Sequence, residues 1–152
     1  MINIDEKLAN ILLSGLLASV LSVIITSITN YFYQKKSEKQ HLSDTLMQLN
    51  TFLISEPFLE SDTALKKYLK GTNDIEDMIK NDKYNAYCIV KYNYLSDICK
   101  YYKYNLEKIN KELALKEYLQ DNKEWWENNR RINYSSYDKE FLHLIEGVVN
   151  EA

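Results

Sequence analysis

The chain has 152 residues, enough for one modest domain and an anchor but too few for two independent hydrophobic cores. Its formal net charge of −3 provides no general excess of Lys and Arg to neutralise phosphates, so the composition carries no strong nucleic-acid signal. Only three Gly and one Pro occur, which leaves few turn residues for a β-rich fold, and we expect an all-α protein.

The first element is an uncharged apolar stretch, residues 8–33, which predicts a transmembrane helix. No Asp, Glu, Lys or Arg occurs between Leu8 and Gln34, and a spanning helix needs about 20 mainly apolar residues. A secretory signal peptide would have a positively charged start and a shorter apolar core, whereas residues 5–7 here read Asp-Glu-Lys. The sequence therefore favours a retained single-pass anchor in contact with membrane lipid.

The lysines on either side of this stretch predict its orientation. Lys7 alone precedes it, whereas Lys35, Lys36 and Lys39 follow it closely. Because cytoplasmic flanks carry the excess of Lys and Arg, we expect a short extracytoplasmic N-terminus, residues 1–7, and a C-terminal domain in the cytoplasm. The membrane expected is the bacterial inner (cytoplasmic) membrane.

Small and hydroxyl-bearing residues recur along the predicted span at steps of four, three, four and three. This set, which we call the span stripe, consists of Gly15, Ser19, Ser22, Thr26 and Thr29. Small residues let helices approach closely in lipid, and hydroxyls can bond across the contact. The stripe predicts a homo-oligomer contact, or the lining of a pore. The alternative is that the hydroxyls bond their own backbone and have no partner.

Leucines at helical spacing continue beyond the span and predict a juxtamembrane helix over residues 34–56. The helix should end before Pro57, because the residue that precedes a proline avoids the α region. Residues 57–152 are expected to form a cytoplasmic helical domain. Its first helix should be capped by Ser61 or Asp62 and stop at Gly71, and a short helix is expected around residues 74–80.

The longest cytoplasmic helix is expected over residues 82–109, with a broad apolar arc that suits a central position. Lys91 lies near the middle of this arc. A buried lysine must find a partner or lose its charge, so Lys91 is either a partnered structural lysine, a side chain that reaches the surface, or part of a pocket. Cys88 and Cys99 are three turns apart on this helix, too far for a disulfide, and should be free, buried thiols.

Two tryptophans followed by two arginines mark the most distinctive cluster of the C-terminal helices. Trp125 and Trp126 should point about 100° apart, so that one enters the core while the other faces a groove or a subunit. Arg130 lies one turn beyond Trp126, and with Lys91 the pair forms a candidate contact for a ligand or a partner protein. The alternative is local packing. Ser135 or Ser136 is expected to cap the last helix.

No motif with a catalytic mechanism is found. There is no Gly-rich phosphate loop, nucleophile elbow or metal-ligand spacing, and the two histidines, His41 and His143, have no local partner. We therefore predict no catalytic residues, no cofactor and no metal site.

The order of elements carries a resemblance. The segment from Asn50 to Pro57, the Trp125–Trp126 pair with Arg130, and a closing helix with Tyr137 and Phe141 resemble a broad group of small, uncharacterised prokaryotic single-pass membrane proteins with a cytoplasmic helical domain. In size and architecture the chain is also similar to the accessory membrane proteins of certain RNA-targeting CRISPR nucleases. That resemblance implies a role in antiviral defence through a membrane oligomer, although the Arg/His motif of that group is not intact here.

These observations predict a non-enzymatic, self-associating inner-membrane protein, and in the most specific version an accessory effector of antiviral defence that forms a membrane oligomer or pore. The alternative is a membrane-tethered scaffold that recruits a cytoplasmic protein partner, with the span as a passive anchor.

Overall fold

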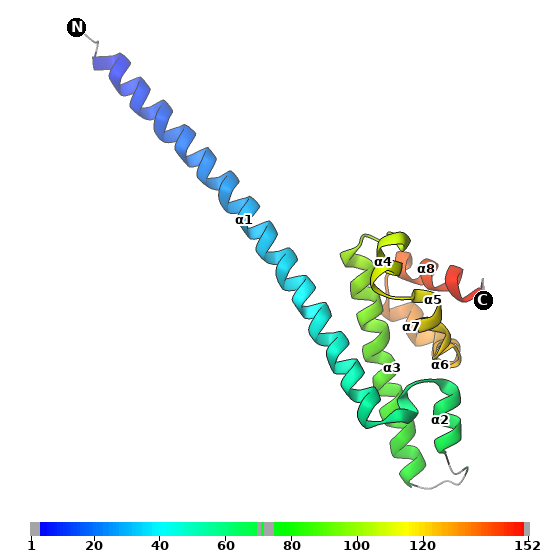
Figure 1. The fold of residues 1–152 in the computed structure, drawn as a ribbon. Coiled ribbons are helices and arrows are strands. Elements are labelled where there is room, and N and C mark those ends of the chain that lie inside the picture. Colours follow the sequence, from blue (N-terminus) through cyan, green and yellow to red (C-terminus); the bar gives the residue numbers. More distant parts are fainter. Residues whose placement is uncertain (1–3, 70, 72–74, 151–152) are drawn as a thin grey trace. The chain divides into compact units, whose positions relative to one another are not determined.

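A computed structural model describes residues 4–69, 71 and 75–150, and the side chains of those between 8 and 148. Over these residues the fold is all-α, as predicted, with eight α-helices and one short 3-10 helix (Figure 1). The chain divides into two compact units, Met1–Gln40 and His41–Ala152, which we call the N-terminal and C-terminal units. Residues 1–3 of the predicted extracytoplasmic terminus lie outside the described residues.

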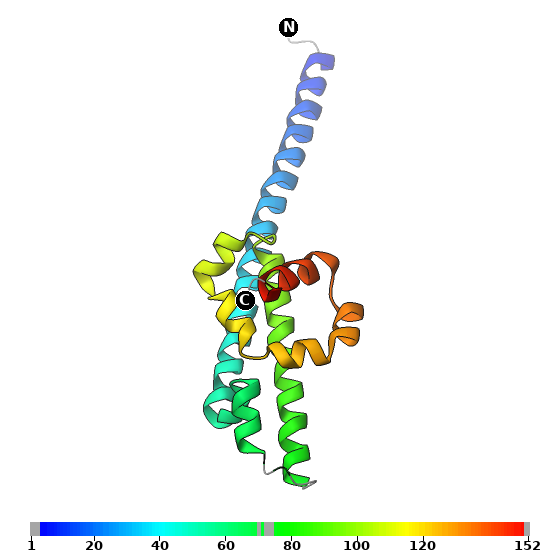
Figure 2. The same cartoon turned by 90° about the vertical axis from the view of Figure 1, so that its right-hand side faces the viewer.

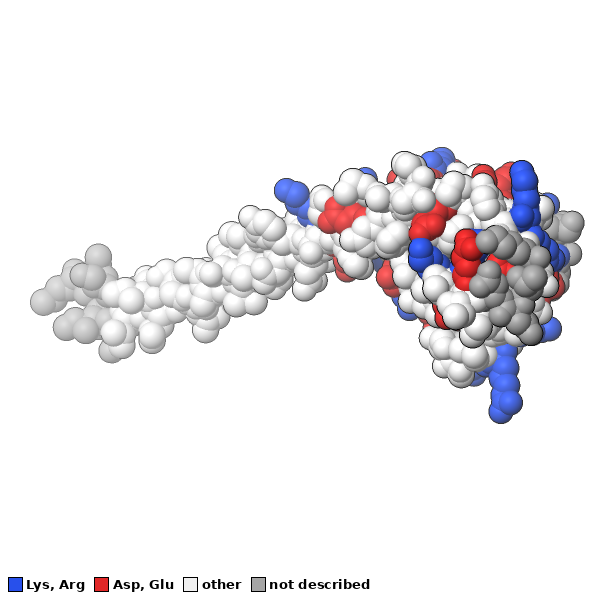
Figure 3. Space-filling model, turned by 90° about the horizontal axis from the view of Figure 1, so that it is seen from below, with Lys and Arg blue, Asp and Glu red and all other residues white. Residues whose placement is uncertain are grey.

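Helix α1 (Ile4–Ser55) contributes to both units. Its stretch from Leu8 to Gln34 is exposed at every residue and contains no charged side chain. It is long and apolar enough to span a membrane, as predicted. In Figure 3 the apolar part of α1 is white on the face shown, because no Lys, Arg, Asp or Glu occurs from Leu8 to Gln34.

The end of α1 belongs to the C-terminal unit, where one side of the helix packs against the core. Leu49 is completely buried, and its neighbours at helical spacing, Leu42, Leu46 and Leu53, are partly buried against the same core. The helix ends at Ser55, as the following Pro57 predicts, and the chain continues through the 3-10 helix η1 (Pro57–Leu59). The predicted juxtamembrane helix therefore forms, as part of α1.

Helix α2 (Asp62–Tyr68) begins with a side-chain cap and ends before the predicted stop. Ser61 is the capping residue, and its hydroxyl accepts from the backbone N–H of Ala64 at 3.1 Å. The helix ends at Tyr68, with Leu69 already extended, so Gly71 lies beyond it. Ser61 was one of the two predicted caps, and the carboxylate of Asp62 is free to bond elsewhere.

Helix α3 (Ile75–Tyr101) is the central helix of the C-terminal unit, with the later helices beside it in both views (Figures 1 and 2). The expected range of 82–109 was wrong at both ends. The start is earlier because the expected short helix around 74–80 is the first part of α3; Asp74 lies outside the described residues. The end is earlier because Lys103 and Tyr104 turn the chain with φ of 51° and 57°, and the N–H of Tyr104 bonds the carbonyl of Cys99 at 2.8 Å.

Five short helices complete the C-terminal unit: α4 (Leu106–Glu112), α5 (Leu115–Gln120), α6 (Lys123–Asn128), α7 (Arg130–Ser136) and α8 (Lys139–Asn150). The predicted cap of the last helix was wrong. Ser135 and Ser136 both donate to the carbonyl of Ile132, inside α7, and Asp138 instead accepts from the N–H of Phe141 at 2.8 Å at the start of α8.

Candidate functional site

Lys91 lies in the interior of the C-terminal unit. Helix α3 carries it on the buried side, where only 1% of the residue is exposed. Its Nζ donates to Oδ1 of Asn122 at 2.5 Å and lies 4.0 Å from a carboxylate oxygen of Asp121. The ammonium is also 4.0 Å from the centre of the Tyr118 ring, within the range of a cation–π contact. Of the three predicted alternatives, the structure gives Lys91 the contacts of a partnered, buried lysine.

Burial governs the electrostatics around this lysine. It lowers the pKa of Lys91 from 10.5 to about 8, against the opposing attraction of Asp121. Burial also raises the pKa of Asp121, although Lys91 acts to lower it. Both shifts disfavour the charged forms, so the attraction across 4.0 Å does not compensate for the removal of these groups from water.

Asn122 connects Lys91 to a chain of polar groups that leads towards the surface. Its Nδ2 donates to the hydroxyl of Tyr84 at 2.7 Å, and that hydroxyl donates to Asp62 at 2.7 Å. The other oxygen of Asp62 accepts from the backbone N–H of Glu124 at 2.9 Å, and the N–H of Asp62 donates to the carbonyl of Asp121 at 2.8 Å. This network, buried at Asn122 and exposed at Glu124, joins α2, α3 and the segment from the α5–α6 loop into α6.

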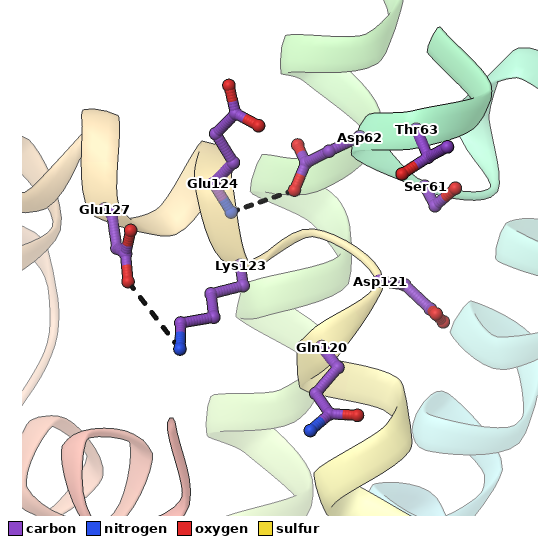
Figure 4. A pocket seen from close by; sticks show the side chains of 8 residues that line it. All are labelled: Ser61, Asp62, Thr63, Gln120, Asp121, Lys123, Glu124 and Glu127. Carbon is purple, nitrogen blue, oxygen red and sulfur yellow. Dashed lines mark hydrogen bonds and ion pairs between the residues drawn. The ribbon is translucent and has the colours of Figure 1, made fainter. Parts of the chain in front are cut away.

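A hollow of about 610 Å³ lies at the outer end of the network (Figure 4). We call it the acidic hollow; its lining residues are Ser61, Asp62, Thr63, Gln120, Asp121, Lys123, Glu124 and Glu127. Figure 4 shows Asp62 turned to the backbone of Glu124, and Lys123 extended towards Glu127, 4.0 Å away. Lys91 is not among the lining residues. Among the described residues no group of three His, Cys, Asp or Glu side chains is arranged to hold a metal ion.

Trp125 and Trp126 both lie in the core, so the expectation that one faces a groove or a subunit was wrong. They are 8% and 3% exposed. Both rings stack with Tyr92 of α3, at 5.3 and 4.6 Å between centroids, and the indole N–H of Trp125 donates to Asn85 at 2.7 Å. Because the Tyr92 ring stacks with both indole rings, two adjacent tryptophans of one short helix can both be buried.

Arg130 is exposed, whereas Lys91 and Trp126 are buried. Helix α6 ends at Asn128, so the four-residue spacing from Trp126 to Arg130 does not fall within one helix. The guanidinium instead bonds Glu146 at 2.8 Å and lies 5.3 Å from the Tyr134 ring, on the exposed side. None of the three predicted contact residues lines the acidic hollow.

The residues of the span stripe are all exposed in the single chain. Ser19 donates to the carbonyl of Leu16 at 2.8 Å and Thr29 to that of Ile25 at 2.8 Å, so these two hydroxyl protons bond within the helix. A Cβ atom added at Gly15 would meet nothing within 4 Å. The hydroxyl oxygens still accept, and the small side chains leave room for another helix.

The two cysteines, Cys88 and Cys99, are free and buried, as predicted. Burial raises the pKa of each thiol to about 12, which keeps it protonated and unreactive at neutral pH. His41 and His143 are both exposed.

Sequence reasoning missed the most buried polar partner, Asn122. It lies in a polar segment before a short helix, a pattern typical of a surface cap. Its side chain makes no cap bond and is directed instead at Lys91 and Tyr84.

Comparison with known proteins found no matching family model, no matching curated protein and no matching solved structure.

Proposed function

We propose that this chain is a non-enzymatic, single-pass protein of the bacterial inner membrane that associates with copies of itself through α1. The observation that carries the proposal is the exposure of every residue from Leu8 to Gln34, with apolar side chains around the helix. An apolar helical surface of this length needs lipid or protein around it.

The charges that flank the span support its orientation. Lys35, Lys36 and Lys39 follow it, against Lys7 alone before it. The positive-inside rule then favours a cytoplasmic location for the C-terminal unit and an external N-terminus. In this arrangement the free thiols of Cys88 and Cys99 would lie in a reducing compartment.

The span stripe supports self-association. Leu and Ile cover much of the remaining helix surface and are as apolar as lipid tails, so they give no preference for protein over lipid. Small residues at Gly15, Ser19 and Ser22 instead permit a close approach of two helices. In its most specific form, the proposal is an accessory effector of antiviral, CRISPR-type defence, in which the oligomer perturbs or conducts across the membrane.

The experiment is light scattering of the full chain in mild detergent, which gives its mass as a multiple of 18.0 kDa. We expect a discrete multimer, and we expect Ser19→Leu with Ser22→Leu to reduce it towards the monomer while insertion is retained. The control is Val20→Leu with Ser27→Leu, which also enlarges two side chains of the span, although by less in total, on a face of the helix away from the stripe. A monomeric wild type, or a double variant with unchanged mass, would contradict the proposal. Conductance of planar bilayers then tests the pore.

A second function, a tethered scaffold that recruits a cytoplasmic protein, is favoured by one feature of the C-terminal unit. A mainly apolar hollow of about 400 Å³ lies between the end of α1 and α3, lined by Phe52, Leu59, Ala86, Tyr87 and Val90, among others. Exchange of the span for an unrelated transmembrane helix separates the two functions. A passive anchor survives the exchange, and an associating one does not.

A further inference from the structure

The end of α1 has a second face that the core of the C-terminal unit leaves uncovered. Beside the core-facing leucines, the helix exposes Ser43, Met47, Asn50 and Ile54, which we call the 43–54 stripe. Met47 is 66% exposed and Ile54 is 83% exposed. The neighbouring exposed positions Asp44, Gln48 and Thr51 are polar, and Phe52 is the exposed apolar exception.

The spacing of this stripe repeats that of the span stripe. Its members are four, three and four residues apart, and Ser43 follows Thr29 by fourteen residues, two complete heptads. The same seven-residue spacing therefore connects the two stripes along α1 (Ile4–Ser55), with Tyr33, Lys36 and Gln40 at the positions between them. A repeat of 3.5 residues per turn keeps the same face towards a partner helix only if the helices form a left-handed supercoil.

From these observations we propose that the 43–54 stripe is a contact with the same stripe of a second copy, parallel and in register. The inference rests on the proposed self-association and extends it into the C-terminal unit. The residues of the stripe suit a second copy of this chain as the partner. In a parallel, in-register pair Met47 meets Met47 and Ile54 meets Ile54, while Asn50 meets Asn50, whose amide both donates and accepts. An antiparallel pair would set Ser43 against Ile54 and lose these matches.

The size of the stripe explains why its partner would be another copy already held by the span. Two large apolar side chains per chain cover on the order of a few hundred Å², well below the roughly 1,000 Å² of a stable independent interface. The contact would therefore form only where the span fixes two helices side by side. Lys36 lies on the same repeat, and its long side chain can turn towards lipid headgroups and so reduce repulsion from its copy.

Disulfide cross-linking of the full chain in membranes tests the inference. Single cysteines are introduced as Met47→Cys, Asn50→Cys and Ile54→Cys, with Gln48→Cys and Ser55→Cys as controls, and a mild oxidant is added. All five positions are exposed, so the core is undisturbed. The wild type should not cross-link, because Cys88 and Cys99 are buried. A disulfide needs Cα atoms within about 7 Å, which the facing positions of a supercoiled pair meet and the outer ones do not.

We expect cross-linking at the three stripe positions to exceed the controls by about tenfold. Ser19→Cys and Ser22→Cys report on the span in the same membranes. If these span cysteines cross-link while the stripe positions do not exceed Gln48→Cys and Ser55→Cys, the inference is overturned and the proposed self-association stands. If neither set cross-links, both are overturned.

Discussion

The Nζ of Lys91 donates a hydrogen bond to Oδ1 of Asn122, 31 residues further along the chain, at 2.5 Å and out of contact with solvent. This bond joins the central helix α3 to the loop before α6. It also provides the closest partner of a cation that burial would otherwise strongly disfavour. Removal of Asn122 alone should therefore be strongly destabilising to the C-terminal unit.

Asn122→Leu should lower the free energy of unfolding by about 3 kcal/mol, because it leaves the ammonium of Lys91 buried without its acceptor. The loss should be smaller when Lys91→Met is added, since the double variant removes the charge together with its partner. We expect a coupling energy of about 2 kcal/mol between the two sites. Both tryptophans of the chain lie in this unit, so their fluorescence during chemical denaturation of the full chain in detergent follows its unfolding.

An exposed ion pair provides the control for this cycle. Lys66 and Glu124 are 2.5 Å apart, but their side chains are 63% and 50% exposed. Their coupling energy should stay below about 1 kcal/mol. A Lys91–Asn122 coupling no larger than that of the exposed pair would contradict the structural role assigned to Lys91.

Lys91 should contribute more to the stability of the C-terminal unit as the pH rises from 7 to 9. Burial lowers the pKa of Lys91 from 10.5 to about 8, so over this range the unfolded chain binds more protons than the folded one. Stability rises with pH wherever the unfolded state binds more protons, and the gain from Lys91 should be about 1 kcal/mol. Cys88 and Cys99 act in the opposite direction, because burial raises the pKa of both thiols and they stay protonated in the folded chain when the unfolded ones ionise. The Lys91 gain is therefore measured as the difference between the wild type and Lys91→Met. The same denaturation curves, recorded at several pH values, measure it, and Lys91→Met should remove the increase.

Above about pH 10 the sign reverses. Burial raises the pKa of the phenols of Tyr84, Tyr87, Tyr92 and Tyr118, so they stay protonated in the folded chain when their unfolded counterparts ionise. The folded state then binds more protons and stability falls. If the Lys91→Met variant still gains stability between pH 7 and 9, a group other than Lys91 causes the increase.

Parts of the fold that depend on a local stretch of sequence could be predicted. The contacts of the candidate site, which join distant stretches, could not. Pro57 ends α1 and the leucine spacing before it places Leu49 in the core, both from local pattern. The position of Lys91 on a buried arc followed from the same periodicity. Its partner did not, because Asn122 is brought to it only by the packing of distant segments. The end of α3 was missed since neither Gly nor Pro marks the turn at Lys103 and Tyr104.

Asp138→Ala should lower the free energy of unfolding by about 1–2 kcal/mol through the loss of the α8 cap. Its carboxylate accepts from the N–H of Phe141 and from the hydroxyl of Tyr104, each at 2.8 Å, and lies 3.3 Å from Lys100. Burial alone would raise the pKa of Asp138, but these three donors hold it below its usual value. The stability it contributes is therefore present above about pH 4 and lost as the pH falls further. Unfolding curves at pH 3 to 6 check this, and Ser135→Ala, which removes no cap, should leave them unchanged.

Lys103→Gly should raise the free energy of unfolding by about 1 kcal/mol. Lys103 has φ of 51°, a left-handed conformation that costs a side-chain-bearing residue about 1–2 kcal/mol and costs glycine nothing. Part of that gain is offset, because glycine makes the unfolded chain more flexible. Asp97→Gly is the matched control: it places glycine at an exposed position inside α3, where we expect a loss of about 1 kcal/mol. Chemical denaturation measures the change in the free energy of unfolding for both variants. Changes of opposite sign would establish that the turn after Tyr101 is strained. A loss in both variants would mean that the side chain of Lys103 contributes more stability than its backbone conformation costs.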